Sequence, residues 1–290
     1  MKNRRSVLEI LVTLPSALWL AIFFLVPTVV VMAIAFKPTN PYGGAGTGWT
    51  VATWLSLGNP SYPAILWRTL WLSLLTTAAS IVFAVPVGYY LARIRKRWRQ
   101  FLLLLIIVPF WTSFLIRIFA WKVLLHPDGF IKQGLVFLHL AGDGVSLLYN
   151  PWAVLLVMIY SYVPFAVLPI YAAAERFDFQ LIEAARDLGA KQWQSFLKVF
   201  LPGIRRGLLT AVLMVFIPAL GSYLIPDLVG GPDSEMIGNK IAQRVFVDRN
   251  LPHASALSSL LTLAVLLPMT VVLFLPGRRG RPDLMAGEGK

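Results

Sequence analysis

The sequence predicts an all-α, polytopic membrane protein with six transmembrane helices. Apolar residues make up 58% of its 290 residues and charged residues only 13%, whereas about a quarter of the residues in soluble domains are charged. Its apolar stretches are long enough to cross a bilayer, which takes about 20 residues in a helix. Its basic residues gather between these stretches, a pattern typical of cytoplasmic loops.

The first two spans are predicted at about 10–36 and 64–92. The first follows Lys2, Arg4 and Arg5. Its apolar run is longer than the roughly 7 to 15 residues of a secretory signal, so we interpret it as an uncleaved helix with a cytoplasmic amino end. The second span ends at the basic cluster 93–99, which is expected to face the cytoplasm.

The third span, at about 101–125, contains Arg117 and Lys122 toward its outer end. Because either charge would cost a few kcal/mol at the bilayer centre, two interpretations remain. The side chains extend to the headgroups, or Arg117 faces the bundle interior and lines a pathway. The other spans are predicted at about 151–174, 207–226 and 254–275, so residues 1–290 form a single transmembrane domain.

The charge distribution sets the predicted orientation. Of the 26 Lys and Arg residues, 18 lie before the first span, after the second, between the fourth and fifth, or after the sixth. These segments are expected in the cytoplasm, together with both termini. The net charge of +13 is explained by this clustering next to membrane lipid and requires no nucleic-acid partner.

The cytoplasmic segment 175–206 has the pattern of two short helices joined by a glycine. Asp178 can cap the first helix, and Gly189 can end it in the left-handed conformation. Pro202 is expected to stop the second helix because it has no amide hydrogen. On its own, the pattern equally fits a solvated loop with two surface helices. The apolar residues at helical spacing are Leu181, Ala184, Ala185 and Leu188, then Trp193, Phe196, Leu197 and Phe200.

Part of this segment resembles the EAA loop of binding-protein-dependent ABC importer permeases. That pattern reads Glu-Ala-Ala, three residues, Gly, nine residues, Ile, one residue, Leu-Pro. Val199 stands where Ile is usual, and the matching residues are Glu183, Ala184, Ala185, Gly189, Leu201 and Pro202. The resemblance implies that these seven residues form a cytoplasmic coupling loop, which docks into a separate ATP-hydrolysing subunit and carries its motion to the spans.

Three further stretches resemble permeases of the spermidine/putrescine type. They are Pro109 to Trp121, Tyr149 to Tyr171, and Ile217 to Gly231 followed by Ile237-Gly238-Asn239. The resemblance implies one permease subunit of a type I importer for polyamines in a bacterial inner membrane. The implied partners are a second permease, expected to be a different chain, two ATP-binding subunits and an extracytoplasmic solute-binding protein.

The substrate stays open at this point. Several relatives carry Glu where this chain has Ser222, and that difference leaves polyamine specificity in question. Arg117, if it faces inward, would suit a carboxylate-bearing solute such as an opine or an amino acid derivative. A polyamine would need aromatic faces or carboxylates. The candidate pathway residues are Arg117, Tyr160, Tyr162, Phe216, Tyr223 and Asp227, although ordinary packing or interfacial anchoring is the alternative for each tyrosine.

The sequence shows no catalytic chemistry. It contains no Gly-x-x-x-x-Gly-Lys-Ser/Thr phosphate loop, so ATP and Mg are expected on the partner subunits and no cofactor on this chain. It shows no nucleophile with a base and no cluster at metal-ligand spacing, so we predict neither an enzyme nor a metal site. Buried carboxylates are nearly absent from the spans, which argues against an ion-coupled carrier. An ATP-independent channel is the remaining alternative.

Overall fold

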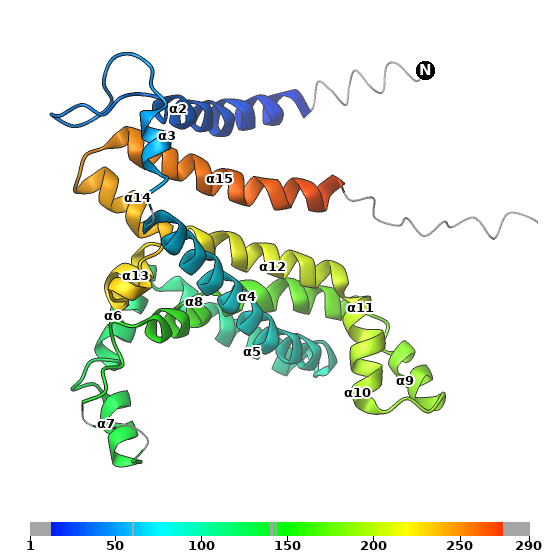
Figure 1. Cartoon of the computed structure of the whole chain (residues 1–290). Helices are drawn as coiled ribbons and strands as arrows, with labels where there is room; N and C mark the ends of the chain where they lie inside the picture. Colours follow the sequence, from blue (N-terminus) through cyan, green and yellow to red (C-terminus); the bar gives the residue numbers. More distant parts are fainter. Residues whose placement is uncertain (1–12, 60, 140–141, 143, 275–290) are drawn as a thin grey trace, which may run out of the picture. The chain divides into compact units, whose positions relative to one another are not determined.

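The computed structural model describes residues 13–59, 61–139, 142 and 144–274. These residues form helices and turns, with one isolated bridge between Thr39 and Ala45, so the predicted all-α class is confirmed. The chain divides into two compact units, residues 1–54 with 251–290 and residues 55–250 (Figure 1). The basic residues predicted to flank the first and sixth spans, Lys2, Arg4, Arg5, Arg278, Arg279, Arg281 and Lys290, lie outside the described residues.

The first unit pairs helices from the two ends of the chain. A helix over Thr13–Ile34 contains a π-helical turn, η1 (Ala21–Leu25), followed by α2 (Val26–Ile34). It packs against α15 (Leu251–Phe274). The loop after α2 leads into the short α3 (Ala52–Ser56). Small polar side chains are favoured where apolar helices approach closely, and Ser258, Ser259 and Thr262 meet Pro27, Thr28, Val31 and Met32 around a cavity of about 220 Å³.

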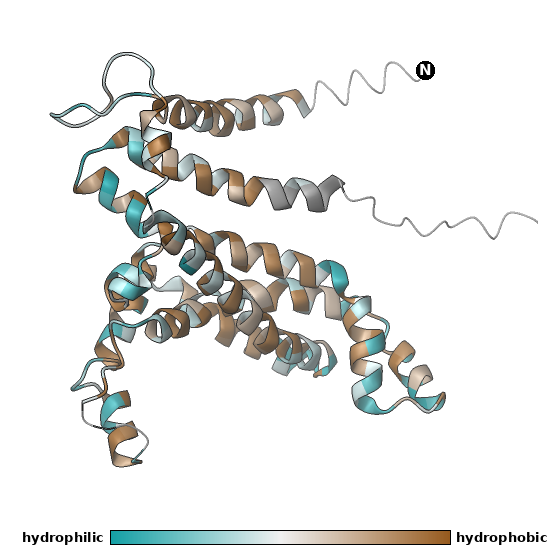
Figure 2. Cartoon of the chain, in the orientation of Figure 1, coloured by the Kyte–Doolittle hydropathy of each residue, from teal (hydrophilic) through white to brown (hydrophobic). Residues whose placement is uncertain are grey.

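The second unit is built on three packed helices, α4 (Ser61–Arg93), α8 (Pro151–Glu175) and α12 (Arg205–Leu220). They approach closely because small residues lie between them. A Cβ added to Gly88 would come within 2.8 Å of Ile170, and one added to Gly207 within 2.4 Å of the Ala173 Cβ. Hydrophobic residues cover these helices (Figure 2). Short hydroxyl side chains line the buried side of α4: Thr69, Ser73, Thr76, Thr77 and Ser80.

Three helices are each long and apolar enough to cross a membrane: Thr13–Ile34, Ser61–Arg93 and Pro151–Glu175. The number rises to five if two sharply bent helix pairs each count as one span. Within α15, the stretch Leu251–Leu266 counts as a shorter apolar helix, and it lies at the position of the predicted sixth span. The count of six therefore stays a prediction.

The predicted third span is not one continuous helix. α5 (Lys96–Ile107) leads into a 3-10 turn, η2 (Val108–Trp111), and α6 (Phe114–Leu124) then leaves at 92°. Pro109 lies in the turn, and the Thr112 hydroxyl donates to the Pro109 carbonyl at 2.6 Å. Because Thr112 is extended (φ −80°, ψ 152°), the helix cannot continue through it. α7 (Phe130–Phe137) follows α6.

The predicted fifth span, 207–226, is also interrupted. α12 ends at Leu220, and α13 (Leu224–Val229) begins a separate short helix after Gly221, Ser222 and Tyr223. Near the end of α12, the Tyr162 hydroxyl donates a hydrogen bond to the Pro218 carbonyl at 3.3 Å. A 3-10 turn, η4 (Pro232–Ser234), and α14 (Ile237–Phe246) complete the unit.

Candidate functional site

The segment 175–206 forms the predicted helix, glycine turn and second helix at one end of the second unit (Figure 1). Its first helix is α9 (Gln180–Asp187). The Asp178 carboxylate accepts a hydrogen bond from the amide of Gln180 at 3.0 Å. The start of this helix is therefore held by the side chain that the sequence indicated.

Gly189 ends α9 as the sequence predicted. Its φ is +90°, and no atom lies within 4 Å of a Cβ built there. The amides of Gly189 and Ala190 donate to the carbonyls of Arg186 and Ala185 at 2.9 and 3.0 Å, the two-bond arrangement of a glycine C-cap. The requirement for glycine is thus conformational, because space for a side chain is present.

The apolar side of α9 is largely exposed. The spacing of Leu181, Ala184, Ala185 and Leu188 predicted one apolar face, and of these four only Ala185 is partly covered, whereas Leu188 is 90% exposed. Ile182 is the buried residue of this helix. A helix turns by about 100° per residue. Because Ile182 faces the rest of the unit, the side of α9 formed by the four apolar residues faces away from it. Glu183 is also exposed, on the opposite side of the helix from these four residues.

The second helix runs through Pro202 instead of stopping there. α10 (Gln192–Ser195), the π-helical turn η3 (Phe196–Phe200) and α11 (Leu201–Gly203) are continuous, and the bend of 72° to α12 comes at Ile204. In η3 the amide of Leu201 donates to the Phe196 carbonyl, one residue further back than in an α-helix. This wider turn accommodates a proline, whose ring otherwise clashes with the preceding turn.

An aromatic cluster attaches this segment to the helix bundle. The Phe200 ring is fully buried, and the ring of Tyr89, on α4, lies 4.9 Å from it and 5.3 Å from the ring of Phe196. Arg93 donates to the Tyr89 hydroxyl at 2.7 Å. The other members are Phe177 and Phe179. The sequence analysis missed Tyr89, Phe177 and Phe179 because their meeting is a tertiary contact between separate elements.

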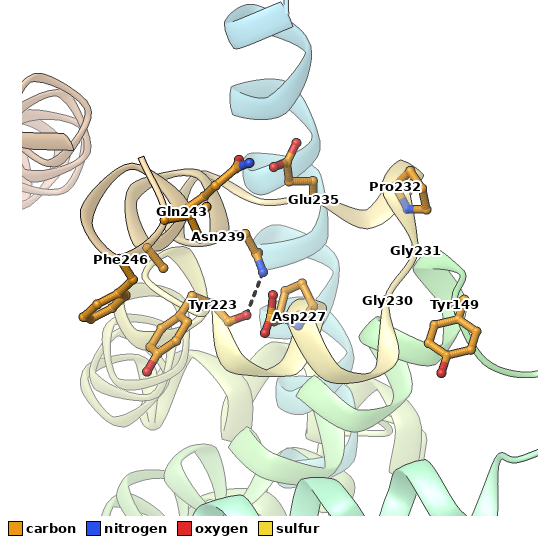
Figure 3. Close-up of a pocket in the computed structure, with 13 residues that line it drawn as sticks. Tyr149, Tyr223, Asp227, Gly230, Gly231, Pro232, Glu235, Asn239, Gln243 and Phe246 are labelled. Atoms are coloured by element: carbon orange, nitrogen blue, oxygen red, sulfur yellow. Dashed lines mark hydrogen bonds between the residues drawn. The ribbon is translucent and has the colours of Figure 1, made fainter. Parts of the chain in front are cut away.

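A cavity of about 630 Å³ lies at the other end of the second unit, beside the break between α12 and α13 (Figure 3). Of the six candidate pathway residues, it brings together Tyr223 and Asp227. Its other lining residues are Tyr149, Pro226, Gly230, Gly231, Pro232, Glu235, Asn239, Ala242, Gln243, Phe246 and Val247. The sequence analysis named Asn239 only as part of a resemblance and did not name Glu235.

The cavity is acidic and aromatic. Asp227 and Glu235 line it, and no Lys or Arg is among its lining residues. Glu235 lies 3.4 Å from the Lys240 ammonium group. Within the described chain the Asp227 carboxylate has neither an ion pair nor a hydrogen bond, and it is exposed. With the rings of Tyr149, Tyr223 and Phe246 nearby, the arrangement suits an organic cation.

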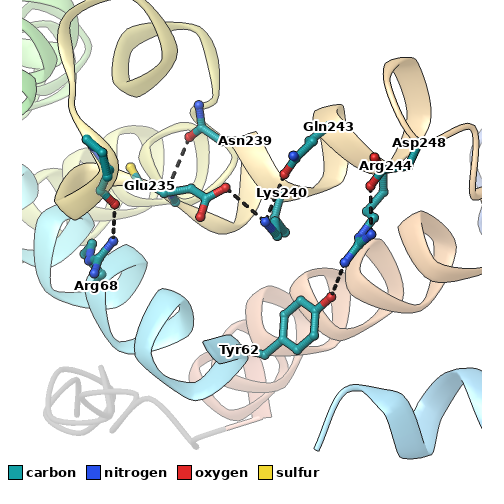
Figure 4. A network of polar contacts seen from close by, with 10 residues as sticks. Tyr62, Arg68, Glu235, Asn239, Lys240, Gln243, Arg244 and Asp248 are labelled. Carbon is teal, nitrogen blue, oxygen red and sulfur yellow. Dashed lines mark hydrogen bonds and ion pairs between the residues drawn. The ribbon is translucent and has the colours of Figure 1, made fainter. Parts of the chain in front are cut away.

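Polar contacts from α14 hold this cavity in shape. The Asn239 side-chain amide donates to the Tyr223 carbonyl at 2.8 Å, and its oxygen accepts from the Met236 amide at 3.3 Å (Figure 3). On α4, Arg68 donates to the Pro232 carbonyl at 2.9 Å (Figure 4). The break after α12 is thereby tied to α14, and η4 is tied to α4.

Arg244 joins α14 directly to α4. It donates to the Tyr62 hydroxyl at 3.0 Å and to the Asp248 carboxylate at 2.7 Å (Figure 4). Burial lowers the pKa of the Arg244 guanidinium, but these two partners more than offset that effect and the pKa is raised. The charge of Arg244 therefore stays constant across physiological pH.

The other four candidate pathway residues do not line the cavity. The Arg117 guanidinium lies over the Phe110 ring at 4.5 Å, and its Nε and Nη1 are buried without a hydrogen-bond partner in the part of the chain that is described. Tyr160 packs against Trp121 at 5.3 Å. Tyr162 is buried, and Phe216 is partly buried on α12. Among the described residues no group of three His, Asp or Glu side chains is placed to hold a metal ion.

Residues 84–277, which include segment 175–206 and the cavity, match the family of the binding-protein-dependent transport system inner membrane component. The chain belongs to this family. Among other members, the spermidine/putrescine transport system permease protein PotB of Haemophilus influenzae is 34% identical over 249 residues, covering 86% of this chain and 87% of that protein. PotB of Escherichia coli is 32% identical over 253 residues, with 87% and 92% covered.

The fold of this inner membrane component is also found among solved structures. A chain of the bacterial alginate ABC transporter, solved in complex with an alginate pentasaccharide-bound periplasmic protein, superposes with a TM-score of 0.68. The match covers 93% of this chain and 94% of the other, at 18% identity. At that identity the likeness shows the fold alone, which is that of an ABC importer permease.

Proposed function

We propose that the chain is the permease subunit of an ATP-driven, binding-protein-dependent importer of polyamines such as spermidine and putrescine. The observation that carries this proposal is the Asp227 carboxylate, left unpaired in a cavity lined by aromatic rings and lacking any basic side chain. The net charge of the chain is +13, whereas the ionisable side chains that line this cavity are Asp227, Glu235 and the two tyrosines. PotB relatives named for these two polyamines support the substrate class.

The chemistry of the cavity fits a polyamine in two respects. A polyamine carries two or more ammonium groups, and each is attracted by a carboxylate or by the face of an aromatic ring. Its methylene chain needs apolar surface between those groups, which the rings of Tyr149, Tyr223 and Phe246 offer. A carboxylate-bearing solute would be repelled by Asp227, and Arg117 lies outside the cavity. The cation is therefore the better candidate.

The proposed assembly contains two permeases, two ATP-binding subunits and an extracytoplasmic solute-binding protein. We propose that the second permease is a different chain, that the assembly lies in a bacterial inner membrane, and that both termini are cytoplasmic. The exposed apolar side of α9 supports a partner at the coupling loop, since the described residues leave Leu188 90% exposed. The alginate transporter, solved with a periplasmic protein, supports a partner at the other end.

In the proposed cycle the ATP-binding subunits hold ATP and Mg, and this chain moves in response. Their closure displaces the coupling loop through Glu183, Ala184, Ala185 and Gly189. The rings of Tyr89 and Phe200, with their neighbours, pass the displacement to α4 and α8. The cavity beside Asp227 then opens to receive the polyamine from its binding protein, and ATP hydrolysis resets the arrangement.

The test is uptake by cells that lack the gene. We expect deletion to abolish ATP-dependent uptake of radiolabelled spermidine and putrescine, and the intact gene to restore it. A companion ATPase with its phosphate-loop Lys replaced serves as the control for ATP dependence. Unchanged polyamine uptake in the deletion strain, with loss of uptake of an opine or an amino acid derivative, would overturn the substrate. Full uptake with the inactive ATPase would overturn the mechanism and favour a carrier or channel.

A further inference from the structure

An apolar groove lies between α4 and α5, and none of its lining residues belongs to segment 175–206 or to the cavity. Its volume is about 430 Å³. The two helices are consecutive and antiparallel, so Leu91 and Leu102 mark the end of the groove nearest the connecting turn, and Pro86 and Ile106 mark the far end. Its other lining residues are Val87, Tyr90 and Leu105. Of all these side chains, only that of Tyr90 has a polar atom.

The turn at the near end of this groove is strongly basic. Residues 93–99 contain five Arg and Lys residues. Two of them have partners, because Arg93 donates to Tyr89 at 2.7 Å and Arg99 pairs with Glu175 at 2.9 Å. The side chains of Arg95, Lys96 and Arg97 are exposed and have no acidic partner among the described residues.

Aromatic residues flank the same turn. Trp98 and Phe101 lie on α5 with ring centroids 6.3 Å apart, and both are more than half exposed. Exposed Trp next to basic residues at the end of an apolar helix is typical of the headgroup level of a membrane. The groove thus begins where the headgroups of the inner leaflet are expected and extends toward the hydrocarbon.

We propose that this groove and turn bind an anionic phospholipid of the inner leaflet. An acyl chain fills the apolar groove, and the phosphate is held by Arg95, Lys96 and Arg97. Charge complementarity selects this occupant, since the ammonium group of a zwitterionic lipid offsets its own phosphate and an apolar helix brings no negative charge to three neighbouring cations. The inference rests on the cytoplasmic position of the turn, and hence on the orientation in the proposed function, but it does not depend on the transported solute.

The experiment uses the full chain, purified in detergent with its partner subunits and stripped of lipid. Dioleoyl-phosphatidylglycerol and dioleoyl-phosphatidylcholine are added separately, and bound lipid is counted by native mass spectrometry while the unfolding temperature is recorded. We expect phosphatidylglycerol to bind more tightly and to raise the unfolding temperature, and phosphatidylcholine to do neither. Equal effects of the two lipids would overturn the proposal.

Two variants test whether the lipid binds at this groove and turn. A triple variant, Arg95→Gln, Lys96→Gln and Arg97→Gln, is expected to weaken phosphatidylglycerol binding by roughly fivefold for each charge removed. Leu102→Trp keeps the charges but fills the groove, and it is expected to lower binding as well. The matched control, Arg278→Gln, Arg279→Gln and Arg281→Gln, removes the same charge from the other predicted cytoplasmic segment and is expected to bind the lipid as the parent chain does.

The outcomes separate the possible occupants. Equal loss in the triple variant and in its control would mean general attraction to positive charge and would overturn a specific site. A photoreactive probe at Leu105→Cys is expected to label lipid. Labelling of another helix, from this chain or a partner subunit, would show that protein covers the groove and would also overturn the proposal. None of these measurements involves transport, so a failure here is distinguishable from a failure of the proposed function.

Discussion

Gly189 shows how a single residue sets the shape of the coupling loop. Its φ of +90° lies in the region that glycine adopts freely and other residues avoid. The sequence predicted this conformation because the glycine C-cap is a local motif of about six residues. Asn239 acts over a longer range, since it joins α14 to the carbonyl of Tyr223. Its role could not be predicted because it depends on how two elements meet.

Replacing Gly189 is expected to impair coupling without preventing membrane insertion. A β-branched residue at this φ costs about 1 to 2 kcal/mol or more, so we expect Gly189→Val to lower ATP-driven uptake by roughly tenfold. Gly189→Asn is the matched control and should retain more uptake, because Asn tolerates the left-handed region. Equal uptake by the Val variant and the parent chain, at equal protein level in the membrane, would show that the turn is not required.

Asp227 is expected to determine affinity for the cation. A carboxylate about 4 Å from an ammonium group contributes about 1 to 4 kcal/mol, depending on the local dielectric. Asp227→Asn should therefore lower uptake at sub-saturating spermidine by about fivefold or more. Asp233→Asn is the control, since Asp233 is exposed on η4 but does not line the cavity. If both variants transport equally, the cavity is not on the route of the solute.

The helices of this chain are shaped by prolines in ways that the sequence indicated only in part. Pro27 and Pro202 each follow a π-helical turn and stay inside a helix. Pro109 instead lies in a 3-10 turn before a bend of 92°. Because a proline removes a hydrogen bond, it predicts a weak point in a helix. Whether the helix widens, bends or ends there depends on packing, so the bounds of the third and fifth spans could not be predicted.

The aromatic cluster is expected to hold the coupling loop against α4 and α8. Phe200 is fully buried in it, and truncating a buried Phe typically costs about 3 to 5 kcal/mol. We expect Phe200→Ala to raise hydrogen exchange in residues 175–206 and to abolish uptake while ATP hydrolysis by the companion subunits continues. Phe137→Ala removes a ring that is 83% exposed and serves as the control. Unchanged exchange and uptake in Phe200→Ala would exclude a transmitting role.

At the scale of the whole molecule, composition and charge predicted the class and the orientation. Both predictions rest on the composition and charge of many residues, so the misassignment of any one residue changes them little. The cavity was only partly predicted: Tyr223 and Asp227 belong to it, but Tyr149 comes from a distant segment that meets them only after folding. Sequence periodicity describes one helix at a time, and it contains no information on which helices meet.

The orientation can be tested directly because the chain has no cysteine. Single variants Asp233→Cys and Lys191→Cys place a thiol on η4 and on the coupling loop. With a membrane-impermeant maleimide and intact spheroplasts, we expect labelling of the first variant only. Lys191→Cys should react after the membrane is permeabilised. The opposite pattern would invert the topology and place the coupling loop outside.

The central claim is that residues 175–206 form a cytoplasmic contact with a separate ATP-hydrolysing subunit. Its most direct test is site-directed cross-linking from Leu188→Cys, since this side chain is 90% exposed on the apolar side of α9. With a photoreactive maleimide in native membranes, we predict an adduct between this chain and the ATP-binding subunit. An adduct with lipid alone, or with an extracytoplasmic protein, would contradict the claim.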